Sequence, residues 1–259
     1  MTLYITDLSD PAIYPAKVRK AIKYSNEDDR FNLITKNPGP IKDEIFAKLS
    51  GEQLNKIILQ VSVTGLGHTN WEPNVPSPED VFAIIKTIRD EYAEVPVTLR
   101  YDPIIPGIND TQKCFQAFAT KAGSLRVEGV TASVLDVYPH RRLRINNMYA
   151  HYHKDINDYY PNNTKHASDS YRENTLTVLK NELTVHGISL SVCCEKNIAL
   201  KATPTCEGGC DWWNLVDGWA TVIEVTPGYQ RGGCTCPKAT QLLTYANLCH
   251  HDCVYCYRK

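Results

Sequence analysis

Hydrophobic and polar positions along this chain follow two alternating periods. Short runs rich in Val and Ile are typical of buried parallel strands, and amphipathic runs typical of helices separate them. The runs that predict strands are residues 3–6, 31–35, 56–63, 95–101, 127–135, 189–193 and 240–247. The runs that predict helices are residues 16–24, 41–49, 77–92, 111–122 and 167–186. This alternation is typical of an α/β fold in which helices cover a parallel sheet.

The alternating runs predict one α/β domain over residues 1–259, built as a (β/α) barrel, because single barrels routinely reach this length. Three stretches depart from the alternation. Residues 36–40, Lys-Asn-Pro-Gly-Pro, are predicted to continue neither strand nor helix. Residues 139–166, rich in Arg, His, Tyr and Asn, are predicted to be an insertion with its own task, such as covering a substrate. Residues 194–236 form a cysteine-rich segment that is predicted to be irregular from residue 206.

Charge is nearly balanced, with 28 Lys and Arg residues against 29 Asp and Glu residues. No global field therefore favours nucleic acid or an anionic membrane as a partner. The first residues lack a basic run followed by an apolar one, and no apolar stretch is long enough to span a bilayer. We therefore expect a soluble, cytoplasmic protein without membrane partners. Ten cysteines in a reducing compartment argue against a disulfide scaffold and favour metal or redox chemistry.

Three cysteines cluster near the end of the sequence. Cys249, Cys253 and Cys256 are separated by three and then two residues. Three thiolates in one flexible loop can bind one metal centre, and a 4Fe-4S cube held by only three protein ligands keeps its fourth iron free. The alternative interpretation is half of a zinc site, because paired Cys-x2-Cys motifs are common zinc ligands.

The Cys-x3-Cys-x2-Cys spacing, with Tyr255 just before the last cysteine, resembles the signature of the radical S-adenosylmethionine (radical SAM) enzymes. In most of these enzymes the cysteine loop follows the first strand, so the resemblance is to an uncharacterised branch with a rotated order and a C-terminal cluster motif. It implies a circularly permuted, TIM-barrel-like fold and a 4Fe-4S cluster on Cys249, Cys253 and Cys256. It also implies reductive cleavage of S-adenosylmethionine to a 5'-deoxyadenosyl radical that abstracts hydrogen from the substrate.

Other parts of the chain resemble the same branch. They are residues 35–38 (Thr-Lys-Asn-Pro), residues 100–104 (Arg-Tyr-Asp-Pro-Ile), Ser133 with Asp136 and Tyr138, Cys194 with Glu195, and Cys234 with Cys236. One departure is clear. The branch usually begins with Ser-Arg-Arg-Thr-Asp, whereas residues 6–10 here read Thr-Asp-Leu-Ser-Asp. The role of those arginines in the branch is therefore not carried over to this chain.

Polar residues are predicted to gather at the carboxyl ends of the strands, where barrels of this type form their active sites. These residues are Lys36, Ser62, Thr64, Arg100, Asp102, Asp136, Tyr138, Glu195 and Cys249. We expect Lys36, Thr64, Arg100 and Asp102 to bind S-adenosylmethionine, with Arg100 and Asp102 as partners of its carboxylate and hydroxyl groups. The alternative is that Arg100 and Asp102 pair with each other and stabilise the rim. By resemblance Tyr255 lies beside the adenine, and it could also be a packed core residue.

Four further cysteines, Cys194, Cys210, Cys234 and Cys236, match cysteines associated with the same branch. Four thiols from separate loops are enough for a second cluster or a zinc ion, and we favour an auxiliary iron–sulfur cluster. Two neighbours, Cys193 and Cys206, make the ligand set ambiguous, and buried reduced thiols are the alternative. We expect Cys114, which is alone in a predicted helix, to be a core residue.

Basic and aromatic residues are concentrated between residues 140 and 154, including Arg141, Arg142 and Arg144. Because cations contact phosphates and aromatic rings stack on bases, this composition favours a base or modified base in DNA or RNA as the substrate. A solvated polar loop is the alternative, and a peptide or small metabolite is the alternative substrate. The implied partners are S-adenosylmethionine and an electron donor such as flavodoxin or ferredoxin. A non-catalytic zinc or iron–sulfur binding protein remains the alternative from another functional class.

Overall fold

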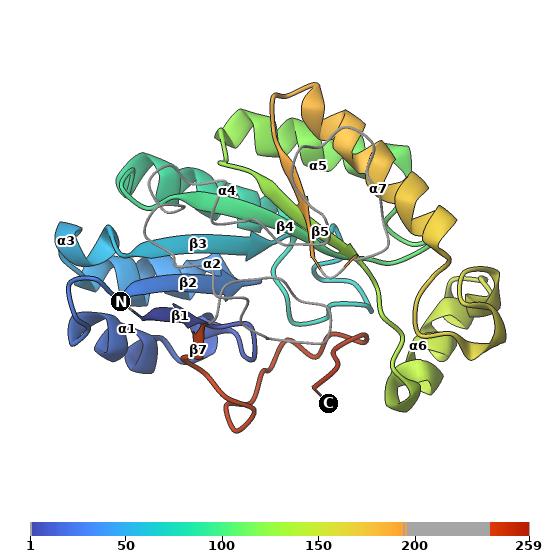
Figure 1. Ribbon diagram of the computed structural model, residues 1–259, viewed down its shortest axis with the longest axis horizontal. Helices are drawn as coiled ribbons and strands as arrows, with labels where there is room; N and C mark the ends of the chain where they lie inside the picture. Colours follow the sequence, from blue (N-terminus) through green and yellow to red (C-terminus); the bar gives the residue numbers. More distant parts are fainter. Residues whose placement is uncertain (1, 194, 196–238, 259) are drawn as a thin grey trace.

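The computed structural model describes residues 2–193, 195 and 239–258. Their centre is one parallel sheet of seven strands in the order β6-β5-β4-β3-β2-β1-β7 (Figure 1). The strands are β1 (Leu3–Ile5), β2 (Arg30–Thr35), β3 (Ile57–Ser62), β4 (Val97–Ile104), β5 (Val130–Val134), β6 (Leu190–Val192) and β7 (Thr240–Gln241). The predicted α/β class and parallel sheet are confirmed. Among the described residues the sheet is open, with β6 and β7 at its edges, rather than closed into a barrel.

Helices connect most of the strands. They are α1 (Pro15–Lys23), α2 (Pro38–Pro40), α3 (Gly51–Leu54), α4 (Pro78–Glu91), α5 (Gln112–Leu125), α6 (Pro139–His151) and α7 (Asp169–Thr184). The side chains of Ser77, Thr111 and Ser168 cap the first turns of α4, α5 and α7, as short polar residues at helix starts commonly do. No helix in the described part of the chain is long and apolar enough to cross a membrane.

The two faces of the sheet differ in polarity because side chains alternate along a strand. Leu59, Leu99 and Val130 belong to the same buried core as helix residues such as Ile85 and Phe115. Polar residues such as Gln60, Thr98 and Thr131 alternate with these core residues along the strands. One register row on the polar face runs from Ser62 through Arg100 and Thr131 to Ser191 across four strands. One face of the sheet therefore packs under helices, and the other carries polar groups toward its carboxyl end.

Residues 36–40 were predicted to continue neither strand nor helix, but Pro38–Pro40 form a helical turn. Asn37 caps a helical turn by accepting from the Gly39 N–H at 3.3 Å, and Pro38 occupies the first helical position. Proline is tolerated there because the N–H it lacks has no partner inside the helix. The chain continues through a π-helical turn (Ile41–Ile45) and a 3-10 turn (Phe46–Lys48), where the sequence predicted one uninterrupted helix.

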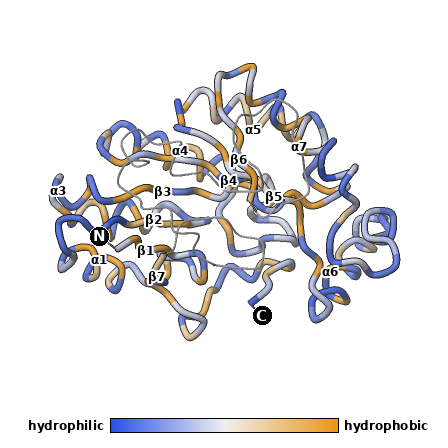
Figure 2. Tube along the Cα trace, in the orientation of Figure 1, coloured by the Kyte–Doolittle hydropathy of each residue, from blue (hydrophilic) through white to orange (hydrophobic). Residues whose placement is uncertain are grey.

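The polar stretch from residue 139 contains a helix that its composition did not predict. Only Ile145 and Tyr149 of α6 are buried, and they lie four residues apart on one face. The Tyr149 hydroxyl also donates to the Pro106 carbonyl at 2.8 Å. Figure 2 shows this region as largely hydrophilic, in contrast to the central strands. Two buried positions are enough to fix the helix against the domain, but too few to produce a clear periodic pattern.

The last predicted strand is much shorter than the sequence indicated. Strand β7 ends at Gln241 rather than at residue 247. A turn follows, in which the Thr244 N–H donates to Asn247 Oδ1 at 3.0 Å and the Asn247 N–H donates to the Thr244 carbonyl at 2.9 Å. Side-chain hydrogen bonds of this kind compete with strand pairing, and here they direct the chain into the C-terminal loop.

Candidate functional site

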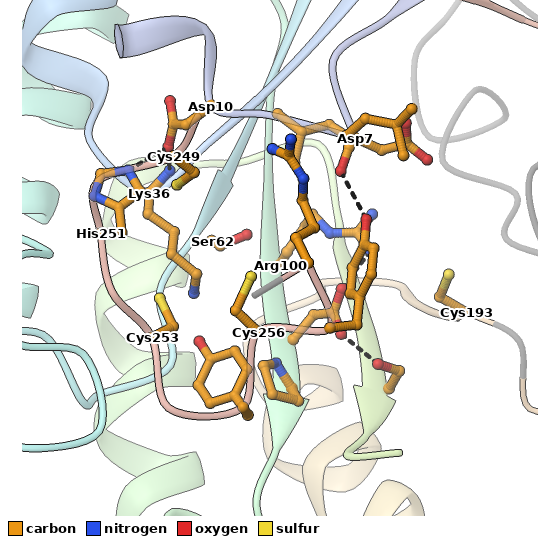
Figure 3. Close-up of a pocket in the computed structure, with 18 of the residues that line it drawn as sticks. Asp7, Asp10, Lys36, Ser62, Arg100, Cys193, Cys249, His251, Cys253 and Cys256 are labelled. Carbon is orange, nitrogen blue, oxygen red and sulfur yellow. Dashed lines mark hydrogen bonds and ion pairs between the residues drawn. The ribbon is translucent and has the colours of Figure 1, made fainter. Parts of the chain in front are cut away.

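A cavity lies at the carboxyl ends of the strands and is closed on one side by the C-terminal loop, residues 244–258. Side chains from the ends of β1 to β6 meet the loop there, as Figure 3 shows. The lining includes Asp7, Asp10, Lys36, Ser62, Arg100, Asp102, Ser133, Asp136, Tyr138, Cys193, Glu195, Cys249, His251, Cys253, Tyr255, Cys256 and Arg258. The structure therefore brings together most of the residues that the sequence placed at strand ends.

All three cysteines of the terminal motif line this cavity. Figure 3 shows Cys249, Cys253 and Cys256 near one another, with Cys193 on the far side. Burial raises the pKa of Cys253 to about 12, and burial also raises the pKa of Cys249, because a thiolate there loses its hydration. Within the described residues, no three His, Cys, Asp or Glu side chains are grouped as ligands of a metal ion. The arrangement therefore offers three thiols to one space without forming a compact single-ion site.

The cysteine loop is fixed by a buried histidine. His251 Nε2 lies 2.7 Å from Asp10 Oδ2, and both side chains are buried. Asp10 also accepts from the Thr35 hydroxyl at 2.7 Å and from the Lys36 N–H at 2.8 Å. One carboxylate thus joins the loops after β1 and β2 to the cysteine loop. Sequence reasoning noted Asp10 only as part of a departure from the related branch, and it did not single out His251.

A second contact runs between the cysteine loop and the segment after β3. The Val254 N–H donates to the Trp71 carbonyl at 3.0 Å, and the Asn74 side chain donates to the His250 carbonyl at 2.8 Å. His251 Nδ1 lies 3.2 Å from the Asn74 carbonyl oxygen. These bonds hold the backbone around the cysteines on both sides of Cys253.

Glu72 is a buried hub that sequence reasoning missed. Its side chain is 1% exposed and accepts from Lys36 Nζ and from the Thr64 hydroxyl, both at 2.8 Å, and from the Tyr255 hydroxyl. Three predicted cofactor residues therefore gather around one carboxylate. Lys36 and Tyr255 line the cavity. Thr64 donates to Glu72 but does not line the cavity. The residue lies in a long loop between β3 and α4, where no periodic pattern marks a buried acid.

Arg100 and Asp102 form the pair that the sequence left open as an alternative. Arg100 donates to Asp102 through Nη2 and to Gln60 Oε1 at 3.0 Å through Nη1, and Ser133 donates to the other Asp102 oxygen. Both residues nevertheless line the cavity. The pairing therefore orients two polar groups toward the same space and stabilises the rim at the same time.

Glu195 and Asp136 line the cavity beyond the ends of β6 and β5. Glu195 forms a buried ion pair with Arg172 and accepts from the Val134 N–H at 2.8 Å. Burial raises the pKa of Glu195, although the Val134 N–H and the Arg172 charge act in the opposite direction. Asp136, which is half-buried, contacts Lys165 at 3.1 Å and His166 at 2.6 Å. Arg172 and Lys165 are thus the cations that hold these two carboxylates.

The three arginines predicted to contact a substrate do not line the cavity. Arg142 donates to the carbonyls of Tyr160 and Thr164 at 3.1 and 3.2 Å, inside the insertion. Arg144 donates to the main chain and side chain of Asp252 at 3.2 and 3.3 Å. Arg142 therefore stabilises the insertion, and Arg144 attaches α6 to the cysteine loop.

Arg141 is partly buried, and its Nε has no hydrogen-bond partner within the described ranges. The predicted ligands of a second cluster, Cys194, Cys210, Cys234 and Cys236, lie outside the described residues, as does Cys206. Cys114 lies in α5 and is half-buried, away from the cavity.

Comparison with known proteins gives a family but no function. A family model described as "Domain of unknown function (DUF1848)" matches residues 8–258. No curated protein matches the chain. The matched span includes the cysteine loop and the ends of strands β2 to β6 that face it.

Proposed function

This chain belongs to the DUF1848 family, and from the contents of its cavity we propose that it is a radical SAM enzyme. The observation that carries the proposal is the meeting of three cysteines, spaced Cys-x3-Cys-x2-Cys, with polar side chains from the carboxyl ends of a parallel sheet. Ligands of open α/β sheets bind at this edge, because the loops there converge. The family match is compatible with this activity but does not test it.

The donor set fits a 4Fe-4S cluster better than a structural zinc ion. Closed structural zinc sites use four protein ligands, whereas Cys249, Cys253 and Cys256 supply three thiols to a cavity that retains polar groups beside them. Three thiolates leave one iron of a cube open to another ligand. Such clusters reach potentials of about −400 mV or lower, in the range that reductive cleavage of a sulfonium requires.

Cys249, Cys253 and Cys256 would hold the cluster, which would supply the electron for cleavage of S-adenosylmethionine to methionine and a 5'-deoxyadenosyl radical, and that radical would abstract hydrogen from the substrate. The chain's own residues bind and orient the cofactor. Lys36 and Tyr255 both bond to Glu72, and Lys36 Nζ lies 5.5 Å from the Tyr255 ring centroid. These contacts fix the positions of both side chains beside the cysteine loop. We propose that the adenine lies against Tyr255.

Polar groups for the rest of the cofactor come from the strand ends. Arg100 and Asp102 line the cavity while paired with each other, and we propose that they share this pairing with the carboxylate and the hydroxyl or amino groups of S-adenosylmethionine. The loop contacts through Asp10, His251 and Trp71 hold the segment around Cys253, the one buried cysteine of the three, and we propose that a bound cofactor completes the exclusion of water there. Limited water access protects a reactive radical from side reactions.

We also propose that the sheet is part of a barrel-like radical SAM fold with a rotated strand order. Strand β7 comes last in the sequence but pairs with β1, so the cysteine loop leaves the strand that precedes β1 in space. Strands β1 to β6 then follow in sequence order, as in a singly wound α/β barrel. This spatial order supports a circular permutation.

The substrate is proposed only as a class. A base in DNA or RNA was the expectation from the basic insertion, but the internal contacts of Arg142 and Arg144 remove part of that argument. The wall formed by Ser133, Asp136, Tyr138 and Cys193 presents hydroxyl, carboxylate, phenol and thiol groups. We therefore propose a substrate with hydrogen-bonding groups, either a nucleobase or a polar metabolite or peptide.

Anaerobic reconstitution tests the proposed function. Wild-type protein purified without oxygen and supplied with iron and sulfide should contain about four iron and four sulfide per cluster, which is the composition of a 4Fe-4S cube. With dithionite and S-adenosylmethionine it should form 5'-deoxyadenosine. A colourless protein with stoichiometric zinc and no 5'-deoxyadenosine would instead identify a non-catalytic zinc protein.

A further inference from the structure

Arg258, two residues after Cys256, uses only part of its guanidinium group in the described structure. Its Nη2 donates to the carbonyls of Asn247, Tyr245 and Thr244 at 3.0, 3.0 and 3.3 Å. Its Nε and Nη1 are buried and have no hydrogen-bond partner among the described residues. Since guanidinium nitrogens are all donors and the group is always charged, two donating nitrogens of a permanent cation lack an acceptor.

Among the described residues Arg141 and Arg172 each have one buried nitrogen without a hydrogen-bond partner, whereas Arg258 has two. Buried polar groups almost always have a partner, because leaving water without one is costly and the cost is greater for a charged group. The three carbonyl contacts explain why the side chain is held in place, since they tie the end of the C-terminal loop to its beginning. The Tyr245 ring also covers the guanidinium, with Arg258 Cζ 5.3 Å from the ring centroid. An aromatic ring face attracts the charge but supplies no oxygen or sulfur acceptor, so Nε and Nη1 still lack a hydrogen-bond partner among the described residues.

The position of Arg258 relates the unpaired donors to the cysteines. Arg258 lines the cavity together with Cys249 and Cys256. Arg258 also follows Cys256 by two residues in the same loop. The guanidinium therefore belongs to the same cavity wall as two cysteines of the motif.

We propose that Nε and Nη1 of Arg258 donate hydrogen bonds to the sulfur atoms of an iron–sulfur cluster on Cys249, Cys253 and Cys256, and that Arg258 thereby raises the reduction potential of the cluster. The inference rests on the proposed function only for the presence of the cluster. One-electron reduction adds a negative charge to the cluster. A fixed cation with donors aimed at the sulfurs stabilises the reduced form more than the oxidised form, and hydrogen bonds to sulfur are a known determinant of cluster potential.

The test is the midpoint potential of reconstituted protein, measured by redox titration with electron paramagnetic resonance and without S-adenosylmethionine. The Arg258→Gln variant should be harder to reduce, with a reduction equilibrium constant at least tenfold lower, which corresponds to 59 mV for one electron. Arg258→Lys should lie between wild type and Arg258→Gln, because it keeps the charge but loses the planar fork of donors.

Lys17 provides a matched control. Its Nζ donates to Asn247 Oδ1 at 3.2 Å, so it is a cation on the same turn that Arg258 holds, but it is exposed and does not line the cavity. Lys17→Gln should leave the potential unchanged. A shift as large as that of Arg258→Gln would overturn the proposal, because it would show a general effect of surface charge.

A purely structural role for Arg258 gives a different result. In that case Arg258→Gln lowers the cluster content or the melting temperature, but the potential of the cluster that remains equals that of wild type, and the proposal is wrong. If Arg258→Gln retains no cluster, the potential of Arg258→Lys decides in the same way. Wild-type protein that binds a cluster but does not cleave S-adenosylmethionine would refute the proposed function alone, and wild-type protein that binds no cluster would refute both.

Discussion

The C-terminal loop and the strand ends that face it build the two walls of one cavity in different ways. The loop contributes its cysteines within eight consecutive residues, from Cys249 to Cys256, and contacts with distant segments hold it in place. The strand wall gathers Ser62, Arg100 and Glu195 from positions far apart in the sequence, and the sheet itself holds them. The cysteines are thus close together in the sequence, and the tertiary structure decides only where they lie. The residues of the strand wall come together only when the sheet forms.

The charges of the two walls are also compensated differently. On the strand wall, ion pairs join residues of the same or neighbouring elements, as between Arg100 and Asp102. On the loop wall, Asp10 and Glu72 each connect three segments of the chain. We therefore expect changes in the strand wall to affect stability first, and changes in the loop wall to affect what the cysteines bind.

The largest expected effect is that of Cys253→Ala. Two thiolates cannot retain a cube with one distinct iron, so the variant should lose its iron and form no 5'-deoxyadenosine. Iron and sulfide analysis and chromatography of the nucleoside measure both effects. Cys114→Ala is the matched control, since Cys114 is a half-buried cysteine of α5 outside the cavity. Undiminished 5'-deoxyadenosine from Cys253→Ala would rule out the proposed ligand set.

The next effect is expected on the strand wall. Arg172→Met leaves the Glu195 carboxylate buried without its cation, and breaking a buried ion pair in this way costs about 3–5 kcal/mol. Denaturation by urea should show this loss in the free energy of unfolding. The Arg172→Met/Glu195→Gln double variant should regain most of it, because the amide oxygen can still accept from the Val134 N–H. Equal losses in the single and double variants would contradict the argument.

Asp10→Asn should weaken the attachment of the cysteine loop. The substituted amide side chain is neutral, and only one of its two terminal atoms is an oxygen that can accept hydrogen bonds. We therefore expect a loss of about 1–3 kcal/mol of stability and faster release of iron to a chelator. Asp29→Asn is a matched control. Asp29 is also buried and accepts two main-chain N–H bonds at 2.9 Å, but it does not line the cavity. Both variants should lose stability, and only Asp10→Asn should release iron faster.

The smallest effect is expected from Arg142→Gln. Its hydrogen bonds go to two carbonyls and, at 3.4 Å, to Asn157 Oδ1, all within the insertion, so we expect a loss of about 1 kcal/mol of stability. Because Arg142 does not reach the cavity, any binding of single-stranded DNA or RNA should keep its dependence on salt. A shallower dependence of log binding constant on log salt would restore the original interpretation of this arginine as a phosphate contact.

The sequence by itself determined the fold class and the position of most site residues along the strands. Buried strands such as β3 are continuous apolar runs broken by single polar residues, and this pattern is visible without a structure. The carboxyl ends of parallel strands share one edge, so Lys36, Arg100, Asp102 and the cysteines could be placed together in advance. The spacing of the three cysteines needed no folding information at all.

Only the tertiary structure decided which of these groups are paired and what holds them. Glu72, Asp10 and His251 lie in loops, where a buried charged residue has no periodic signal and is recognised only by its partners. The α6 helix likewise depends on two buried residues, and its Arg142 and Arg144 donate to carbonyls and to Asp252. The physical reason is that pairing depends on distances between segments far apart in the chain, and a sequence pattern records only the preferences of neighbours.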